Sequence, residues 1–138
     1  MRYLRLFEDF HNNFEELEIK KSHIPMAGTG LFTLVDIYEG TPIAEFTGKI
    51  ITEDEASSLK GERSHYLVAK DDGTILDVYE SDTAAKYAND AVNTEYENNS
   101  EIVENEKGEV WLVSTRYIYA GEEIFCAYGD DYWDNWVP

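Results

Sequence analysis

A pair of glycines near the N-terminus is the first feature that could serve a ligand. Residues 27–32 read AGTGLF, and two glycines around Thr29 let the backbone turn sharply and approach a bound molecule closely. The segment lacks the third glycine of a dinucleotide fingerprint, and no phosphate-loop lysine follows it. A plain turn explains the two glycines equally well, so this motif alone assigns no ligand.

An asparagine and a tyrosine further along the chain have side chains suited to a polar ligand. Asn89 lies in residues 85–91, AKYANDA, and the two ends of its amide can bind an amine and a carboxylate. Tyr128 ends an apolar run and precedes Gly129, so its hydroxyl can point into a pocket. Taken one at a time, the residues are explained better by the alternative, in which Asn89 binds local backbone and Tyr128 is half-buried.

The composition is that of a folded acidic domain. The chain has 138 residues, of which 43% are hydrophobic, enough for one ordinary domain with a core. Its 29 acidic and 11 basic residues give a net charge of −18, which argues against direct binding of nucleic acid or of an anionic membrane. A basic partner fits this charge, and solubility at high salt is the alternative explanation. The aromatic content of 14% excludes a disordered acidic tail.

Cysteine usage and hydropathy bear on the compartment. The single cysteine, Cys126, excludes an internal disulfide and a zinc cluster of several cysteines, and it fits a reducing compartment. The apolar runs are far shorter than the roughly 18 residues that a membrane span needs. The first residues turn acidic too early for a secretory signal. We therefore expect an intracellular protein, nuclear or cytoplasmic, with no membrane partner.

The spacing of apolar residues predicts a mainly β domain with a few short helices. Apolar residues every three or four positions predict a helical segment over residues 1–16. Short β-rich runs cut by glycine and acidic turns follow it, over residues 17–21, 31–37, 42–46, 49–52, 66–69, 74–78, 110–113, 116–118 and 123–128.

Turn and cap signals refine this prediction. Residues 71–73 (DDG) and 106–108 (EKG) are typical of hairpin turns. Thr52 and Glu55 form a capping box that opens a short helix over residues 53–59. Residues 81–87 could form a second short helix, and the polar residues 89–106 are expected to form an irregular loop.

Taken together and in this order, the motifs resemble the SET domain, the family of S-adenosylmethionine-dependent protein lysine methyltransferases. Five segments are each similar to a family motif. AGTGLF (27–32) is similar to the Gly-x-Gly cofactor turn, and IAEFTG (43–48) is similar to the Glu-Tyr-x-Gly strand. YLV (66–68) with ILD (75–77) is similar to the Tyr-Leu-Phe and Ile-Asp strands, KYANDA (86–91) to the Arg-Phe-x-Asn-His-Ser segment, and residues 122–129, from EEI to YG, to the closing motif. The resemblance covers residues 17–133, with 134–138 as a tail. The ending, YGDDYW, is especially similar to minimal SET enzymes of large DNA viruses.

The resemblance implies a fold, a cofactor and roles for individual residues. The fold would be several short curved sheets with a C-terminal pseudoknot, and the activity would be lysine methylation on a basic protein such as a histone tail. The cofactor-binding residues would be Ala27, Gly28, Thr29, Gly30 and Asn89 at the methionine end of S-adenosylmethionine and Tyr87, Asp90 and Trp133 near its adenosine. The lysine channel would consist of Phe46, Tyr66, Tyr128 and Tyr132. Tyr128 would be the catalytic residue, where the methyl group meets the lysine amine.

Several features depart from the family pattern. Phe46 stands where the family usually has tyrosine, and Asp90 replaces the usual histidine. A few residues more than usual separate Asn89 from the Asn98-Asn99 pair. No cysteine-rich tail follows Trp133 in this sequence, so we expect the protein to lack the zinc-bearing cap of many relatives and to bind no metal. The alternative is therefore a non-catalytic SET-like module that binds basic peptides. The sequence leaves the oligomeric state open, and a homodimer is among the alternatives.

Overall fold

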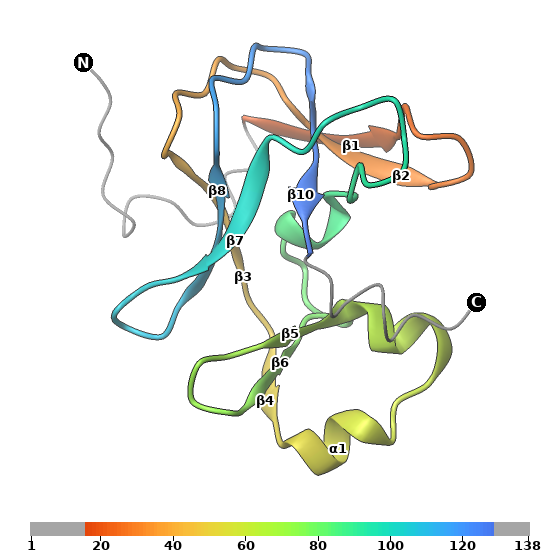
Figure 1. The fold of residues 1–138 in the computed structure, drawn as a ribbon, viewed down its shortest axis with the longest axis vertical. Coiled ribbons are helices and arrows are strands. Elements are labelled where there is room, and N and C mark those ends of the chain that lie inside the picture. The colour runs from red at the N-terminus through yellow and green to blue at the C-terminus, as the bar shows by residue number, and fades with distance from the viewer. Residues whose placement is uncertain (1–15, 129–138) are drawn as a thin grey trace.

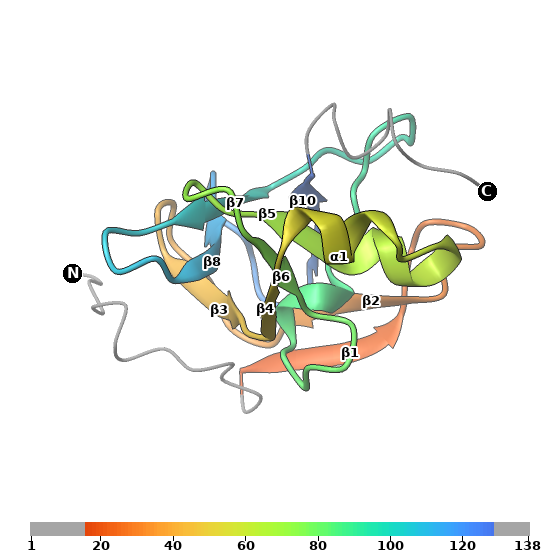
Figure 2. The same ribbon diagram turned by 90° about the horizontal axis from the view of Figure 1, so that it is seen from below.

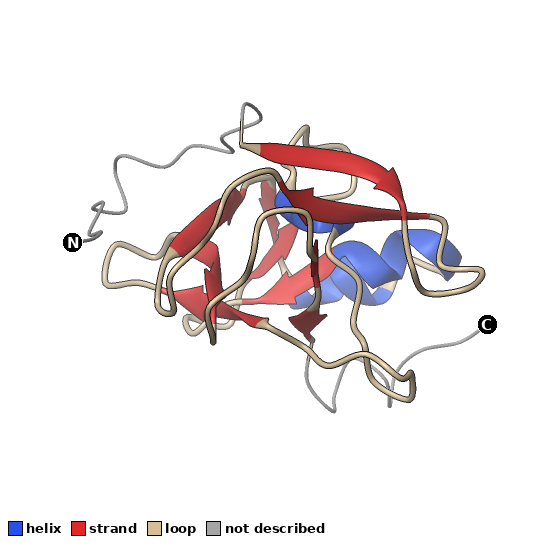
Figure 3. Ribbon diagram, turned by 90° about the horizontal axis from the view of Figure 1, so that it is seen from above, coloured by secondary structure: helices blue, strands red, loops and turns tan. Residues whose placement is uncertain are grey.

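Short strands joined by tight turns dominate the architecture. The computed structural model describes residues 16–128, so the predicted helical segment over 1–16, with Tyr132 and Trp133, lies almost entirely outside the described residues. Within the described part the strands form three small sheets, and helices contribute only short pieces (Figures 1 and 3). The predicted mainly β fold of several small sheets is confirmed. None of the helices in residues 16–128 has the length and apolar character needed to cross a membrane.

Two of the sheets enclose most of the core. The first has the order β1 (Leu17–Lys21), β2 (Thr29–Thr33) and β9 (Glu123–Ile124), with antiparallel neighbours. The second has the order β10 (Cys126–Ala127), β7 (Ser100–Glu104), β8 (Val110–Ser114) and β3 (Pro42–Phe46), and only its β10–β7 pair is parallel. Apolar side chains from both sheets and from Ala84, Ala85 and Ala88 form one buried cluster, which includes Leu31, Leu112 and Ile124.

The third sheet contributes Leu76 to the same buried cluster. It has the order β4 (Lys49–Ile51), β6 (Ile75–Asp77) and β5 (Leu67–Ala69), all antiparallel. Figure 2 shows α1 (Glu53–Ser57) and the 3₁₀ helix η2 (Gly61–Tyr66) beside this sheet. The capping box is confirmed: the Glu55 amide donates to the Thr52 hydroxyl (3.1 Å), and the Thr52 amide donates to the Glu55 carboxylate (3.0 Å).

Both predicted hairpin turns are confirmed, whereas some predicted elements are wrong. Residues 71–73 join β5 to β6, and residues 106–108 join β7 to β8. The predicted strand at 116–118 is reduced to an isolated bridge between Ile118 and Ile37. The predicted helix at 81–87 is only the short 3₁₀ helix η3 (Ala85–Tyr87).

The irregular loop predicted over residues 89–106 is wrong at its C-terminal end, where β7 lies between β8 and β10. The polar residues of β7 concealed this strand. Ser100, for example, is buried, and its hydroxyl donates to the carbonyl of Phe125 (2.8 Å). A buried hydroxyl is tolerated in a strand when such a partner satisfies it.

The last described segment runs between parts of the chain that are far apart in sequence. β9 pairs with β2, Phe125 bridges to Asn89, and β10 pairs with β7 (Figure 1). Residues 123–127 therefore have neighbours from the first sheet, from the segment after η3 and from the second sheet. This arrangement is the kind of passage that the predicted pseudoknot requires.

Candidate active site

A pocket of about 490 Å³ collects side chains from six separate stretches of the chain. Its walls come from the turn at residues 24–27, the end of β3, the stretch from η2 into β5, Val78, residues 86–94, and the last described residue. Predicted site residues line this pocket: Ala27, Phe46, Tyr66, Asn89, Asp90 and Tyr128. Motifs that lie up to a hundred residues apart therefore meet at one place.

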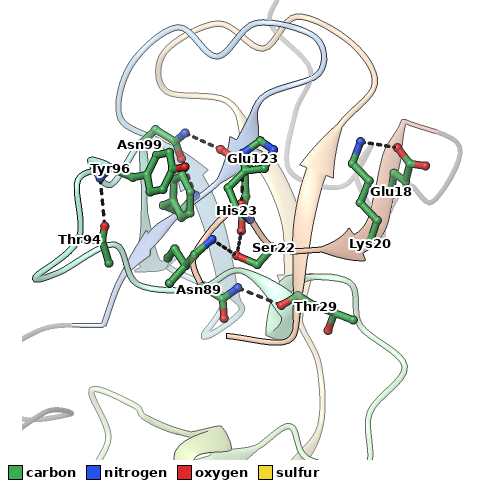
Figure 4. A network of polar contacts seen from close by, with 12 residues as sticks. Glu18, Lys20, Ser22, His23, Thr29, Asn89, Thr94, Tyr96, Asn99 and Glu123 are labelled. Carbon is green, nitrogen blue, oxygen red and sulfur yellow. Dashed lines mark hydrogen bonds and ion pairs between the residues drawn. The ribbon is translucent and has the colours of Figure 1, made fainter. Parts of the chain in front are cut away.

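The turn at residues 22–28, which leads into Gly30 and is called the glycine turn below, is closed by a backbone hydrogen bond and held by a buried carboxylate. The Ser22 amide donates to the Gly28 carbonyl (2.9 Å), which closes the loop over residues 22–28. The Glu123 carboxylate accepts from the Ser22 hydroxyl (2.6 Å) and from the His23 amide (2.8 Å), as Figure 4 shows. A Cβ at Gly30 would lie 2.3 Å from a Glu123 carboxylate oxygen, so Gly30 leaves the space that this carboxylate occupies.

Asn89 connects the turn to the last described segment. Its side-chain Nδ2 donates to the Thr29 carbonyl (2.9 Å), and its backbone carbonyl accepts from the Cys126 amide (2.8 Å). Figure 4 shows the side chain pointing at Thr29. Asn89 thus binds backbone, as the alternative expected, but the backbone is that of distant segments and not local: Thr29 lies 60 residues away in the sequence. Asn89 does so on the wall of the pocket, beside the glycine turn that the ligand reading requires.

Asp90 braces the segments that follow it. Its carboxylate accepts from the amides of Tyr128 (3.1 Å) and Val92 (2.9 Å) and from the side-chain Nδ2 of Asn98 (2.9 Å). Charge-assisted hydrogen bonds of this kind are stronger than neutral ones. Asp90 therefore fixes the backbone of Tyr128 and places a negative charge on the pocket wall.

Tyr128 is fixed at both ends. Its backbone amide donates to Asp90, and its phenolic hydroxyl donates to the Ala88 carbonyl (2.7 Å). Because the hydroxyl proton is directed at Ala88, the oxygen lone pairs face other directions. The half-buried ring lines the pocket.

A comparison with known families decides the fold family. The family model described as the SET domain matches residues 28–129. The chain belongs to the SET domain family. A curated relative, the histone-lysine N-methyltransferase EZH2 of Chaetomium thermophilum, is 27% identical over an alignment of 123 residues; the match covers 81% of this chain and 8% of that protein. At the level of the family, the chain is thus related to protein-lysine methyltransferases. The similarity to minimal viral SET enzymes stays a prediction.

Two aromatic residues of the SET domain form the inner walls of the pocket. Phe46, at the end of β3, is 2% exposed, and Tyr66 ends η2 and packs edge-on against Tyr79 with ring centroids 5.3 Å apart. Arg63 holds η2 against β6, because its guanidinium donates to the buried Asp77 carboxylate (3.0 Å). Tyr66 is therefore carried by an anchored helix, and Phe46 is carried by β3, which pairs with β8.

Some predicted site residues of this SET domain lie elsewhere. Gly28, Thr29, Gly30 and Tyr87 do not appear among the residues that line the pocket in the described part of the chain. Thr29 takes part through its carbonyl, and Tyr87 packs against the core cluster with the Lys86 ammonium 5.5 Å from its ring centroid. Their cofactor contacts stay predictions.

Sequence reasoning missed the residues that support the site from behind. Glu123 is 3% exposed and Asn99 is fully buried. The Asn99 amide accepts from the Phe125 backbone N–H (2.8 Å) and donates to the Glu123 carbonyl (3.0 Å), so it holds the segment that carries the carboxylate. The sequence signal that could have indicated a buried carboxylate was the position of Glu123 directly before the apolar run 124–127.

The remaining polar chemistry near the SET pocket is limited. Burial, with a smaller contribution from the charge of Asp90, raises the pKa of the Cys126 thiol, so the thiol stays neutral and packs in the core. Within residues 16–128, no group of three or more His, Cys, Asp or Glu side chains could hold a metal ion.

Proposed function

We propose that this SET domain transfers methyl groups from S-adenosylmethionine to lysine side chains of a basic protein, of which a histone tail is the type. The observation that carries the proposal is the shared pocket, in which the turn at residues 24–27 and Asn89 meet the aromatic residues Phe46, Tyr66 and Tyr128. A cofactor site and a lysine channel would have to adjoin in this way for the donor and acceptor to react.

The residues present fit the cofactor. S-adenosylmethionine, when bound, supplies an electrophilic methyl group on a sulfonium. Ala27 lies on the pocket wall within the closed turn, where backbone groups can approach a ligand. Asn89 offers an amide, and the Asp90 carboxylate is on the same wall and favours the positively charged groups of such a ligand.

The aromatic walls suit a lysine acceptor. A lysine must be neutral to react with an electrophile, and an apolar channel disfavours its ammonium form and so lowers its pKa. Phe46 is buried and Tyr66 is half-buried, so both can exclude water from the amine. The Tyr128 hydroxyl donates to Ala88, and its lone pairs can accept weak C–H···O contacts from a polarised methyl group.

The net charge favours a basic substrate. A charge of −18 attracts cationic peptides and speeds their encounter with the protein. The curated relative from Chaetomium thermophilum is named a histone-lysine N-methyltransferase, which supports the histone class for this chain.

A second candidate is a non-catalytic module that binds a basic peptide. The buried Phe46 brings no hydroxyl to the pocket. Asp90 stands in place of the usual histidine, and its carboxylate accepts hydrogen bonds from the backbone amides of Tyr128 and Val92. A peptide could occupy such a site without being methylated.

One experiment separates the two candidates. The protein is incubated with S-adenosylmethionine carrying a labelled methyl group and a mixture of histones, and cofactor binding is measured in parallel by calorimetry. We expect binding and label on histone lysines. Binding without label on any lysine would favour the module, and a folded protein that does not bind the cofactor would contradict the enzyme.

Asn89→Ala is expected to weaken cofactor binding. The substitution removes the tether to the Thr29 carbonyl and the amide that faces the pocket. Losing a hydrogen bond to a charged group costs roughly 1.5–3 kcal/mol, which corresponds to about a ten- to hundredfold higher Kd. Calorimetry with S-adenosylmethionine measures the change. Asn105→Ala, in the β7–β8 turn, is the matched control and should leave Kd unaltered. An unaltered Kd in Asn89→Ala would remove Asn89 from the site.

Phe46→Tyr is expected to shift the product distribution toward lower methylation. Phe46 gives the channel a ring without a hydroxyl, so the wild type should proceed beyond monomethyl-lysine. An added hydroxyl can hold the amine with a hydrogen bond worth about 0.5–1.5 kcal/mol, a factor of roughly 2–13 between successive methylation steps. Mass spectrometry of a peptide substrate measures the distribution. If it stays the same, Phe46 is a packing residue and the product number is set elsewhere.

A further inference from the structure

The loop over residues 91–98 returns to the pocket instead of leaving it. Val92 and Thr94 line the same pocket as the turn residues Ile24 and Ala27. Part of the pocket wall is therefore built by this loop, which lies between Asn89 and the Asn98-Asn99 pair.

The loop is internally braced. At its base, the Asn98 side chain donates to Asp90 (2.9 Å) and accepts from the Ala91 amide (2.8 Å). The Thr94 hydroxyl donates to the Ala91 carbonyl (2.6 Å) and accepts from the Tyr96 amide (3.0 Å). These bonds give the loop a defined shape, which a wall of a binding pocket needs.

An aromatic stack fastens the loop to the glycine turn. The Tyr96 ring stacks on Phe125, with centroids 5.3 Å apart and planes 25° apart. On the turn side it stacks on His23 at 6.1 Å, and His23 meets Phe32 edge-on at 5.2 Å. Figure 4 shows Tyr96 between the loop and His23. The His23 amide is in turn held by Glu123, so the stack joins two anchored segments.

We propose that residues 91–98 form a wall of the cofactor pocket, and that Tyr96 is the positioning residue that keeps Val92 and Thr94 opposite the turn at residues 24–27. The inference rests on the proposed function, since it names S-adenosylmethionine as the ligand. Tyr96 itself does not line the pocket within the described residues, so it acts through the two segments that it joins.

The test measures cofactor affinity apart from catalysis. Tyr96→Ala is compared with wild type by calorimetry with S-adenosylmethionine, and by KM and kcat with a histone peptide. Loss of the stacking of Tyr96 on Phe125 and His23 should raise the Kd and the KM for S-adenosylmethionine by roughly three- to tenfold. The kcat at saturating cofactor should stay close to that of wild type. Tyr96→Phe keeps the ring and should restore the wild-type Kd.

The control and a second variant keep the test decisive. Tyr119→Ala removes a ring that is 62% exposed and packs on Tyr117, away from the pocket, and it should leave Kd unaltered. Val92→Ser alters a side chain that is 41% exposed on the wall itself and should raise Kd by about threefold even if Tyr96→Ala folds poorly.

The outcomes separate this inference from the proposed function. If wild type binds the cofactor and both Tyr96→Ala and Val92→Ser bind it equally well, the wall assignment is overturned while the proposed function stands. A lower melting temperature of Tyr96→Ala with an unaltered Kd would likewise reduce Tyr96 to a structural role and overturn its assignment. If wild type does not bind S-adenosylmethionine, the proposed function and this inference both fail.

Discussion

Tyr128→Phe is expected to lower the single-turnover rate of methyl transfer by roughly 10²–10³, the usual cost of removing one preorganised polar group at a reacting centre. The Tyr128 hydroxyl is held by its hydrogen bond to the Ala88 carbonyl, so its lone pairs are oriented before any substrate arrives. The ring and the backbone bond to Asp90 are kept in the variant. Cofactor affinity should therefore remain near that of wild type, and the effect should appear in the rate of the chemical step.

A matched substitution tests whether the effect belongs to the pocket. The Tyr117 hydroxyl also donates a hydrogen bond, to the Asp36 carboxylate (2.8 Å); that bond, with smaller contributions from desolvation and the charge of Asp36, raises the pKa of Tyr117 to about 12. Tyr117 does not line the pocket, so Tyr117→Phe should leave the methyl-transfer rate unaltered. Rapid-quench measurements under single-turnover conditions compare both variants with wild type. A wild-type rate in Tyr128→Phe would show that Tyr128 serves only as a wall of the channel.

Local signals in the sequence were enough for the elements that local interactions determine. The capping box of Thr52 and Glu55 and the turns at 71–73 and 106–108 depend on residues that are neighbours in the chain, and the structure contains all three. The strand β7 was missed because its polar residues are satisfied by distant partners. Ser100, for instance, depends on the carbonyl of Phe125, which no local pattern contains.

The pocket also combines features that the sequence predicts with long-range contacts that it does not. The order of the motifs led to the residues that meet there, among them Asn89 and Tyr128. It gave no account of what holds the glycine turn, since the Ser22 hydroxyl and the Glu123 carboxylate are separated by 101 residues. The role of Gly30 was consequently assigned to a ligand, whereas the structure also requires a small residue there to admit Glu123.

Gly48→Ala is expected to lower the free energy of unfolding by roughly 3 kcal/mol, at the upper end of the usual cost of overpacking. A Cβ at Gly48 would lie 2.2 Å from the backbone oxygen of Asp77 and 3.1 Å from the Cα of Val78. Both neighbours are backbone atoms, so a rotamer change cannot relieve the overlap. Moving them would disturb the pairing of β4 with β6, in which Lys49 lies opposite Asp77.

The damage should extend to the site, because the crowded backbone carries two walls of the pocket. Phe46 precedes Gly48 by two residues and Val78 follows Asp77, and both line the pocket. The control is Gly40→Ala, where a Cβ meets nothing within 4 Å and only the positive φ of 80° opposes alanine, at roughly 1–2 kcal/mol. Urea unfolding of both variants compares the cost of the overlap at Gly48 with the cost of the strained φ at Gly40, provided that the m-values agree. A loss in Gly48→Ala no larger than that in Gly40→Ala would mean that the β3–β4 connection yields, and that the contact with Asp77 does not fix the position of Phe46.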